Sequence, residues 1–256
     1  DRLRSRGLGD VYKRQVMICL FGIIFGNYAA FSSYSQITSI PIALISILLM
    51  NKIARQMGQK ASMMTGTYGG IIGSIIITLF LVFVNPKGDA SKFAIPAFRI
   101  IRPDTWGTLF TGWSAVGLIF ILLVIAWRGV QALSSSIVIT MTADCADYEV
   151  YRTGKYVPGL MGTLFSFVDK LVSSFAPMVA GIMFSMCGFT DHNPVMGDPV
   201  TPGLRGGVVF CAYGMIMIGL VCNLIAMKFY PLTKEKMEEI QDEVAQIKMK
   251  TMAENA

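Results

Sequence analysis

The stretch MTADCADYEVYRTGK, residues 141–155, is a dense cluster of charged residues between two long apolar runs. Its charged residues are Asp144, Asp147, Glu149, Arg152 and Lys155. The runs on either side are apolar enough, and long enough, to cross a lipid bilayer as helices. We therefore interpret residues 141–155 as a short loop at a membrane surface, between two membrane-spanning helices.

The composition of the whole chain supports an integral membrane protein. Of its 256 residues, 54% are hydrophobic and only 15% are charged, with a mean hydropathy of +0.57. Soluble domains carry about 25% charged residues. The net charge of +6 is explained by basic loops next to anionic lipid. We expect an all-α, polytopic bundle of membrane helices whose partner is the lipid bilayer, and no binding to nucleic acid.

Segment lengths predict one incomplete helix and five complete spans. The incomplete helix is residues 16–25, which we interpret as a truncated transmembrane helix. The predicted spans are residues 28–50, 61–84, 117–141, 158–187 and 204–230. A basic loop, residues 51–60, joins the first two of them, and residues 231–256 form a charged tail. Residues 1–15 are a basic leader, non-native or unstructured, and we expect the chain to be a fragment of a longer protein.

The basic residues of the loops predict the orientation in the membrane. One side holds ten of them: Lys52, Arg55, Lys60, Arg152, Lys155, Lys228, Lys234, Lys236, Lys248 and Lys250. The other side holds five: Lys87, Lys92, Arg99, Arg102 and Arg205. The first side is therefore predicted to be cytoplasmic, and the C-terminal tail with it.

Three ionisable residues lie inside predicted spans: Arg128, Asp169 and Lys170. Charges at this depth are costly and usually face a cavity or a partner. Arg128 lies roughly 22 Å from the cytoplasmic end of its helix, and Asp169 roughly 17 Å, at 1.5 Å per residue. We expect these two to pair, either as an ion pair that fixes helix register or as part of a site. Lys170 points elsewhere, as a donor to ligand hydroxyl groups or a counter-charge to a cation-binding carboxylate.

The acidic residues of the 141–155 stretch need an electrostatic partner. Asp144 and Asp147 lie near the C-terminal end of a predicted helix, where the helix dipole disfavours acids. Arg152, Lys155 and the basic loop 51–60 are the available cations, and such a cluster suggests an intracellular gate that forms and breaks. The alternative is an acid–base pair of an enzyme.

Residue types argue against an enzyme or a metal centre. The chain has one histidine, His192, and its five cysteines form no CxxC pair. The acidic cluster has no histidine near it in the sequence, and its one cysteine, Cys145, stands without a second cysteine nearby. We expect no catalytic residues, no metal site and no cofactor.

The stretch ADCADYEVYRTGKYVPGLMGTLFSFVDKL resembles the signature of the glycoside–pentoside–hexuronide:cation symporters, the melibiose-carrier group of the major facilitator superfamily. Its first half matches at Ala143, Asp144, Asp147, Tyr148, Tyr151, Arg152, Thr153 and Gly154. Its second half matches at Gly159, Thr163, Phe167 and Lys170. The chain departs from the signature at Lys155, at Tyr156 and at Glu149, and by Asp169 beside the lysine.

The resemblance implies the C-terminal half of a twelve-helix transporter of a bacterial inner membrane. Lys170 would then link the sugar and cation sites, with Ser166 bonding the sugar. From their depth in the predicted spans, we expect Arg128 and Asp169 to belong to the substrate or coupling site. From the clustering of charge, we expect Asp144, Asp147, Tyr148, Arg152 and Lys155 to form the cytoplasmic gate. The coupling cation, Na⁺ or H⁺, would bind mostly in the absent N-terminal six-helix half.

The leading hypothesis is a sugar:cation symporter that works by alternating access around a midplane site. This part of it alone is expected not to transport, because a lone half cannot enclose that site. Two alternatives remain: a related carrier for a lipid or an organic anion, and a membrane partner subunit that does not transport.

Overall fold

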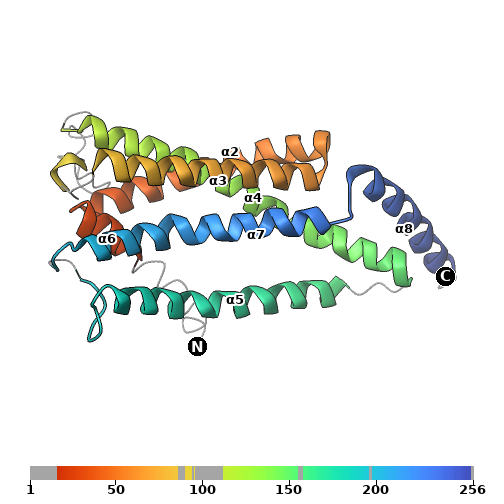
Figure 1. The fold of residues 1–256 in the computed structure, drawn as a ribbon. Helices are drawn as coiled ribbons and strands as arrows, with labels where there is room; N and C mark the ends of the chain where they lie inside the picture. Colours follow the sequence, from red (N-terminus) through yellow and green to blue (C-terminus); the bar gives the residue numbers. More distant parts are fainter. Residues whose placement is uncertain are drawn as a thin grey trace.

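The computed structural model describes residues 16–85, 90–93, 95, 112–154, 158–195 and 198–254. Every regular element within these ranges is a helix (Figure 1). The long helices are α2 (Tyr28–Met57), α3 (Gln59–Val84), α4 (Ala115–Thr153), α5 (Pro158–Met186), α7 (Met215–Phe229) and α8 (Lys234–Glu254). The shorter elements are η1 (Cys19–Ile24), η2 (Ala90–Phe93), α6 (Pro202–Val209) and η4 (Phe210–Gly214). The expected all-α class is confirmed.

Several helices begin at a side chain that satisfies a free backbone N–H. Asn27 accepts a hydrogen bond from Ala30 N at the start of α2, at 3.1 Å. Ser114 accepts from Gly117 N at 2.9 Å at the start of α4, and Thr201 caps α6. These caps place the helix starts at polar residues just outside the apolar runs.

The predicted basic loop 51–60 is wrong, because the chain there is helical almost throughout. α2 continues to Met57, and α3 begins at Gln59. The two helices are separated by Gly58 alone, which has φ of 82°. Glycine adopts this backbone conformation readily. A single reversal residue thus replaces the expected loop.

The predicted loop 141–155 is also wrong, since α4 runs without a break to Thr153. Neither glycine nor proline occurs from residue 130 to residue 153, so nothing in the local sequence ends the helix. Gly154 ends it with φ of 69°. At 39 residues α4 is about 58 Å long. This exceeds the ~30 Å hydrocarbon core, so one or both of its ends lie outside that core.

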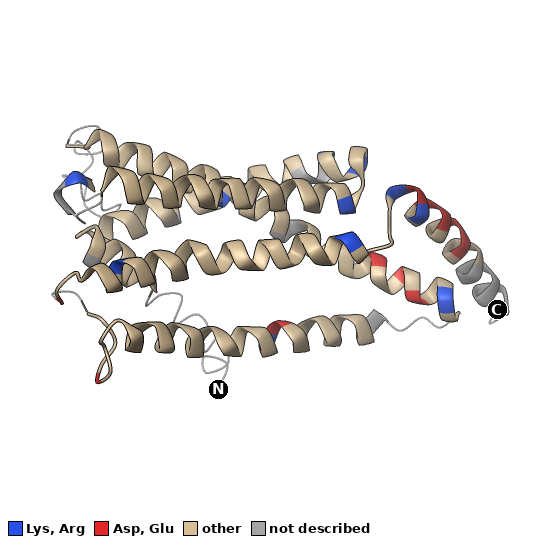
Figure 2. Cartoon of the chain, in the orientation of Figure 1, with Lys and Arg blue, Asp and Glu red and all other residues tan. Residues whose placement is uncertain are grey.

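Within the described ranges, four segments are long and apolar enough to cross a membrane: Gln59–Val84, Ala115–Thr153, Gly159–Met186 and Pro202–Phe229. The last one comprises α6, η4 and α7, which follow one another without a break. Figure 2 shows that charged residues gather towards the ends of the bundle, most densely at the end that carries α8. The middles of the long helices are almost free of charge, as a bilayer interior requires.

The interface between α3 and α4 is lined by small residues of α3. A Cβ atom at Gly69 would lie 2.8 Å from Val130, and one at Gly73 would lie 2.7 Å from Trp127 Cδ1. Small residues of this kind let two membrane helices approach closely. Two hydrogen bonds then join the helices: Trp127 Nε1 donates to Ser74 Oγ at 3.0 Å and to Gly70 O at 3.3 Å.

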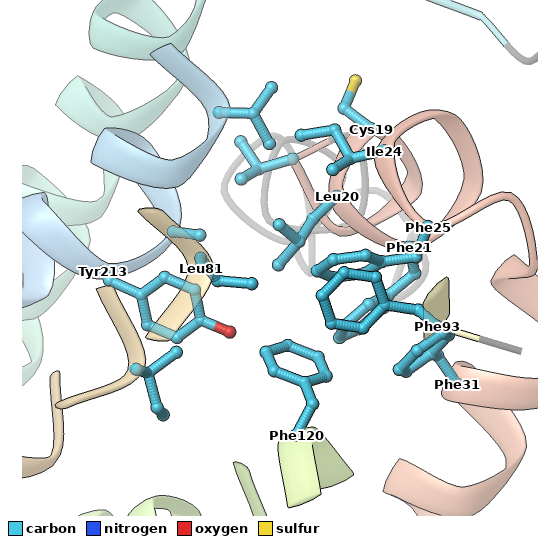
Figure 3. Close-up of a cluster of buried hydrophobic side chains, with 14 of the residues drawn as sticks. Cys19, Leu20, Phe21, Ile24, Phe25, Phe31, Leu81, Phe93, Phe120 and Tyr213 are labelled. Atoms are coloured by element: carbon cyan, nitrogen blue, oxygen red, sulfur yellow. The ribbon is translucent and has the colours of Figure 1, made fainter. Parts of the chain in front are cut away.

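An aromatic cluster closes the end of the bundle opposite α8. Phe25 lies at its centre, with ring centroids 4.4 Å from Phe93 and 4.8 Å from Phe120 (Figure 3). Phe21 and Phe31 stack on each other at 5.2 Å. Aromatic pairs contribute about 0.5–1.5 kcal/mol each beyond the area they bury. This cluster holds η1, η2 and the first turns of α2 and α4 together.

Gly73→Ala is predicted to lower the stability of the helix bundle by about 1–3 kcal/mol, because the new methyl group would collide with the buried Trp127 ring. Gly219→Ala is the matched control, since a Cβ there meets nothing within 4 Å. Thermal unfolding in lipid nanodiscs, followed by circular dichroism, compares the two. Equal melting temperatures for both variants would contradict the close contact.

Candidate functional site: a cavity at Arg128

Arg128 is placed by its neighbour Trp127, which is held against α3. The Trp127 ring lies edge-on to Tyr213 of η4 with centroids 5.4 Å apart, and both side chains are buried. Consecutive residues of a helix point about 100° apart. With Trp127 fixed towards α3, Arg128 therefore points to a different neighbour, α2.

Ser35 of α2 receives the Arg128 guanidinium. Arg128 Nη1 donates to the Ser35 carbonyl oxygen at 3.2 Å and also to the Ser35 hydroxyl oxygen. Ser46, further along α2, donates to the carbonyl oxygen of Gly129 at 3.2 Å. These contacts join α2 and α4 through polar groups within a largely apolar bundle. The guanidinium is partly buried, and no carboxylate of the described residues lies within ion-pair distance of it.

A cavity of about 540 Å³ opens beside Arg128. Five segments contribute to its walls: the first described residues with η1, then α2, α4, α5 and the run η4–α7. Its polar lining residues are Tyr28, Ser32, Ser35 and Arg128, and the remaining wall is apolar or carries a thiol. The volume is within the usual range for small-ligand sites, and a few polar groups in an apolar wall are typical of them.

The predicted pairing of Arg128 with Asp169 is wrong in this structure. Arg128 bonds to Ser35, whereas Asp169 lies on the exposed part of α5. Depth along two helix axes says nothing about the directions in which two side chains point, and Arg128 points to α2.

Ser166, Asp169 and Lys170 do not reach the cavity. Each residue from 162 to 175 of α5 is exposed. The cavity is lined by α5 only further on, at Ala176, Val179 and Ala180. Lys170 is six residues before Ala176, which is about 9 Å along a helix.

The sequence interpretation missed the polar wall that α2 contributes. Ser32 and Ser35 belong to the stretch SSYS, residues 32–35. A run of three serines and a tyrosine inside an otherwise apolar span is a detectable signal, because polar groups within a membrane helix usually face a protein interior or a cavity.

The predicted gate residues lie on the last turns of α4 and are distributed around the helix. Asp144 is buried and lies against Gln59 of α3. Tyr148 is partly buried and stacks on Tyr151, with centroids 6.3 Å apart. Arg152 is exposed and pairs with Glu149 at 3.4 Å. Lys155 lies outside the described residues.

The expected cation partners of Asp144 are therefore not found among the described residues. Arg152 is paired within its own helix, as an i,i+3 contact. Lys60 instead donates to the carbonyl oxygen of Tyr230 at 2.5 Å. Burial beside the amide of Gln59 thus replaces the predicted ion pair with the basic segment.

The end of α4 is covered by α8. A buried cluster joins Val150 of α4 to four residues of the C-terminal segment: Leu232, Met237, Ile240 and Val244. Lys236 Nζ lies 5.4 Å from the centroid of the Tyr151 ring, a cation–π distance.

We call the contact of α4, α8 and the α2–α3 turn the polar junction, comprising residues 56–60, 144–153 and 230–244. Gly58 belongs to it because a Cβ there would lie 2.9 Å from Lys234 Cβ.

Comparison with known proteins identifies the family. Residues 20–234 match the model of the family described as MFS/sugar transport protein. The chain belongs to this family. The predicted resemblance is thereby confirmed at the level of a sugar-carrier family of the major facilitator superfamily, a family of transporters and not of enzymes. With four apolar helices in the described part of the chain, this MFS chain is a multi-pass membrane protein.

Curated relatives from two bacteria are similar over part of their length. A glucuronide carrier protein homolog of Escherichia coli K12 is 29% identical over 160 residues, 61% of this chain and 33% of the relative. A putative sulfoquinovose importer of the same strain is 26% identical over 188 residues, 71% of the chain and 38% of the relative. Its namesake in Salmonella typhimurium is 27% identical over 137 residues, 53% and 28% of the two chains. The chain thus matches about a third of each relative's length, and no solved structure matches it significantly.

Ile240→Ala is predicted to loosen α8 of this MFS chain from α4, because Ile240 is fully buried in their contact. Removing a buried isoleucine costs about 2–5 kcal/mol where the site cannot collapse. Hydrogen exchange of the α8 amides, read by mass spectrometry, should accelerate by at least tenfold, which corresponds to 1.4 kcal/mol.

The control for this variant is Gln241→Ala, the next residue along, whose side chain is exposed. It should leave the exchange of α8 unchanged. Identical exchange in both variants would show that the cluster does not hold α8 in place.

Proposed function

We propose that this chain is part of a secondary active transporter that moves a sugar carrying an acidic group across a bacterial inner membrane. The observation that carries this proposal is Arg128, a cation beside a 540 Å³ cavity, bonded to a serine and not to a carboxylate. A partly buried cation with no acidic partner among the described residues favours an anionic ligand. Guanidinium groups also suit carboxylate and sulfonate oxygens, because they present donors as a planar fork.

The names of the relatives support the same ligand class. A glucuronide carries a carboxylate and sulfoquinovose carries a sulfonate, and two of the similar proteins are named for these compounds. The hydroxyl groups of Tyr28, Ser32 and Ser35 line the cavity beside Arg128. They are suited to bond sugar hydroxyls, which are both donors and acceptors.

The proposed mechanism is symport with a cation, Na⁺ or H⁺, by alternating access. Lys170 remains our proposed link between the sugar and cation sites, with Ser166 and Asp169 beside it on α5. Their exposure supports this role, since polar side chains exposed on an apolar helix need either a cavity or a further helix beside them in a bilayer. The further helices would belong to an N-terminal half of the whole protein.

We also propose that the polar junction acts as the cytoplasmic gate. Asp144, Asp147, Tyr148 and Arg152 lie on the last turns of α4, and Lys155 follows two residues after the helix end in the sequence. The contacts of this helix end to α8 and to the α2–α3 turn support the idea. A movement of α4 during the cycle would have to change them. The second candidate function is transport of a lipid or an organic anion. Arg128 supports this candidate as well, because a cation beside the cavity favours any anionic ligand.

Arg128→Gln is predicted to lower uptake of a radiolabelled glucuronide or of sulfoquinovose by about 10- to 100-fold, the value of one charge-assisted hydrogen bond. The measurement is uptake by cells that express the complete open reading frame encoding this chain. Arg128→Lys, which keeps the charge, should retain more uptake. Two results would refute the acidic-sugar assignment. One is a wild-type transporter that takes up an uncharged methyl glucoside faster than the acidic sugars, and the other is an equal loss of uptake for acidic and uncharged sugars in Arg128→Gln.

Lys170→Ala is predicted to abolish cation-driven accumulation of the sugar while the protein still reaches the membrane. Val172→Ala is the control, an exposed residue of the same helix, and should accumulate sugar normally. Uptake is measured with an imposed Na⁺ gradient and with a proton gradient, to separate the two cations. Wild-type accumulation in Lys170→Ala would exclude the coupling role.

A further inference from the structure

Three sulfur atoms gather where α5 ends and α6 passes beside it. Met183 lies on the last turn of α5, and Cys187 continues that turn by donating its backbone N–H to the carbonyl oxygen of Met183 at 3.1 Å. Their side chains meet, with Cys187 Sγ 3.7 Å from Met183 Sδ. Cys211 of η4 is close enough to Cys187 to interact with it electrostatically. We call Met183, Cys187 and Cys211 the sulfur cluster, which lies at the end of the bundle opposite α8 (Figure 1).

Gly207 of α6 is the residue that lets the two helix ends bring these sulfur atoms together. A Cβ atom at Gly207 would collide with Met183 Sδ and would lie 3.0 Å from Cys187 Sγ. A Cβ atom at the neighbouring Gly206 meets nothing within 4 Å. Only one of these two adjacent glycines therefore faces the sulfur cluster, and any side chain there would displace its sulfur atoms.

The thiol of Cys187 has a single proton for two acceptors. Its Sγ lies 3.7 Å from Met183 Sδ and 3.3 Å from the carbonyl oxygen of Gly203. One S–H group can point fully at only one of them. Together with Sγ itself, three atoms that carry lone pairs thus surround one proton. A cation in place of that proton could bond to all three.

The kind of cation follows from the ligands. Thiolate and thioether sulfur are soft donors, which suit ions such as Cu(I). With metal–sulfur bonds of about 2.3 Å, as in zinc thiolates, sulfur atoms at this separation would subtend roughly 107° at a shared ion, close to the tetrahedral angle. Among the described residues no three His, Cys, Asp or Glu side chains converge as a metal site, so an ion held here must also accept a thioether.

The surroundings favour an ion with one positive charge. Met183, Cys187 and Cys211 all belong to or pack against the main apolar cluster of the bundle. One thiolate neutralises a monovalent ion, whereas a divalent ion would keep a net charge beside apolar groups, which costs free energy. Cys187 is only partly buried, so an ion can reach it from the end of the bundle.

The sulfur cluster borders the Arg128 cavity. Cys211 lines that cavity, and so does Ala180, one turn before Met183 on α5. An ion bound by the cluster would link the end of α5 to the α6–η4 run, and both segments contribute to the cluster and its surroundings.

We propose that the sulfur cluster binds one soft monovalent cation, Cu(I) or Ag(I), through Cys187 Sγ and Met183 Sδ, with Cys211 Sγ as a further donor. On binding, the S–H bond of Cys187 breaks, its proton leaves to water and the thiolate bonds to the ion. The oxidation states of sulfur and metal do not change. The site does not depend on which solute the protein transports.

Native mass spectrometry of the complete purified protein, titrated with silver nitrate in chloride-free buffer, tests the site. The wild type should hold one more tightly bound Ag(I) than Cys187→Ser. Met183→Leu, which nearly conserves volume, should weaken the binding of that ion at least about tenfold, since loss of even an outer-shell partner of a metal costs 10- to 100-fold in affinity.

Two variants control for the loss of a sulfur atom elsewhere. Cys222→Ser removes an exposed thiol, and Met186→Leu removes a thioether that is 84% exposed on the same helix as Met183. Both should bind silver like the wild type. A third comparison uses the adjacent glycines: Gly207→Ala should weaken binding by displacing the sulfur atoms, and Gly206→Ala should not.

The outcomes separate the parts of the proposal. Equal silver binding in the wild type and in Cys187→Ser would overturn the site, as would an equal loss in Cys222→Ser, which any exposed thiol would explain. Wild-type affinity in Met183→Leu would overturn the thioether bond, and wild-type affinity in Cys211→Ser would exclude Cys211 as a donor. Circular dichroism of each variant verifies that its helices are intact.

Discussion

The close approach of α3 and α4 is the constraint on which the rest of the structure depends. It requires small residues on α3, because any side chain at Gly69 or Gly73 would occupy the space of Val130 or Trp127. In a membrane the hydrophobic effect does not drive helices together, so shape and interhelical hydrogen bonds must do so. The indole of Trp127 contributes both, filling the groove of α3 and donating to Ser74 and Gly70.

That interface also determines which helix the side chain of Arg128, the only charged residue in the middle of α4, can reach. Once Trp127 is fixed towards α3, Arg128 turns to α2 and to the cavity, where Ser35 accepts its hydrogen bonds. Trp127 and Arg128, adjacent in the sequence, thus join α4 to two different helices, α3 and α2. A ligand-binding group is most precise when packing of this kind holds its neighbours.

The two ends of the bundle are closed by different means. At one end, aromatic rings from η1, α2, η2 and α4 form a compact cluster around Phe25. At the other end, α8 covers the last turns of α4 with aliphatic residues, and Lys60 and Gly58 bring the α2–α3 turn to the same place. The aromatic end buries large rigid rings, whereas the α8 end joins a small apolar cluster to charged surfaces.

The sequence by itself determined that this chain is an all-α membrane protein, and which family it belongs to. In lipid, a single segment can pair its backbone N–H and C=O groups within itself only as a helix. Apolar runs of about 20 residues therefore indicate membrane-spanning helices. The residues from Asp144 to Lys170 were specific enough to indicate the carrier family. Gly66, Gly69, Gly70 and Gly73 are spaced three or four residues apart, which places them on one face of a helix, but the sequence does not show which helix they contact.

Only the tertiary structure decided which side chains meet. Position along a helix can be counted from a sequence, but the direction of a side chain depends on how the helix is rotated by its neighbours. Arg128 therefore bonds Ser35 and not Asp169, and uncharged serines form the wall of the cavity. Composition likewise could not tell a loop from a helix end at residues 141–153. Charged residues suit both, and α4 continues there because nothing breaks it and α8 covers its apolar face.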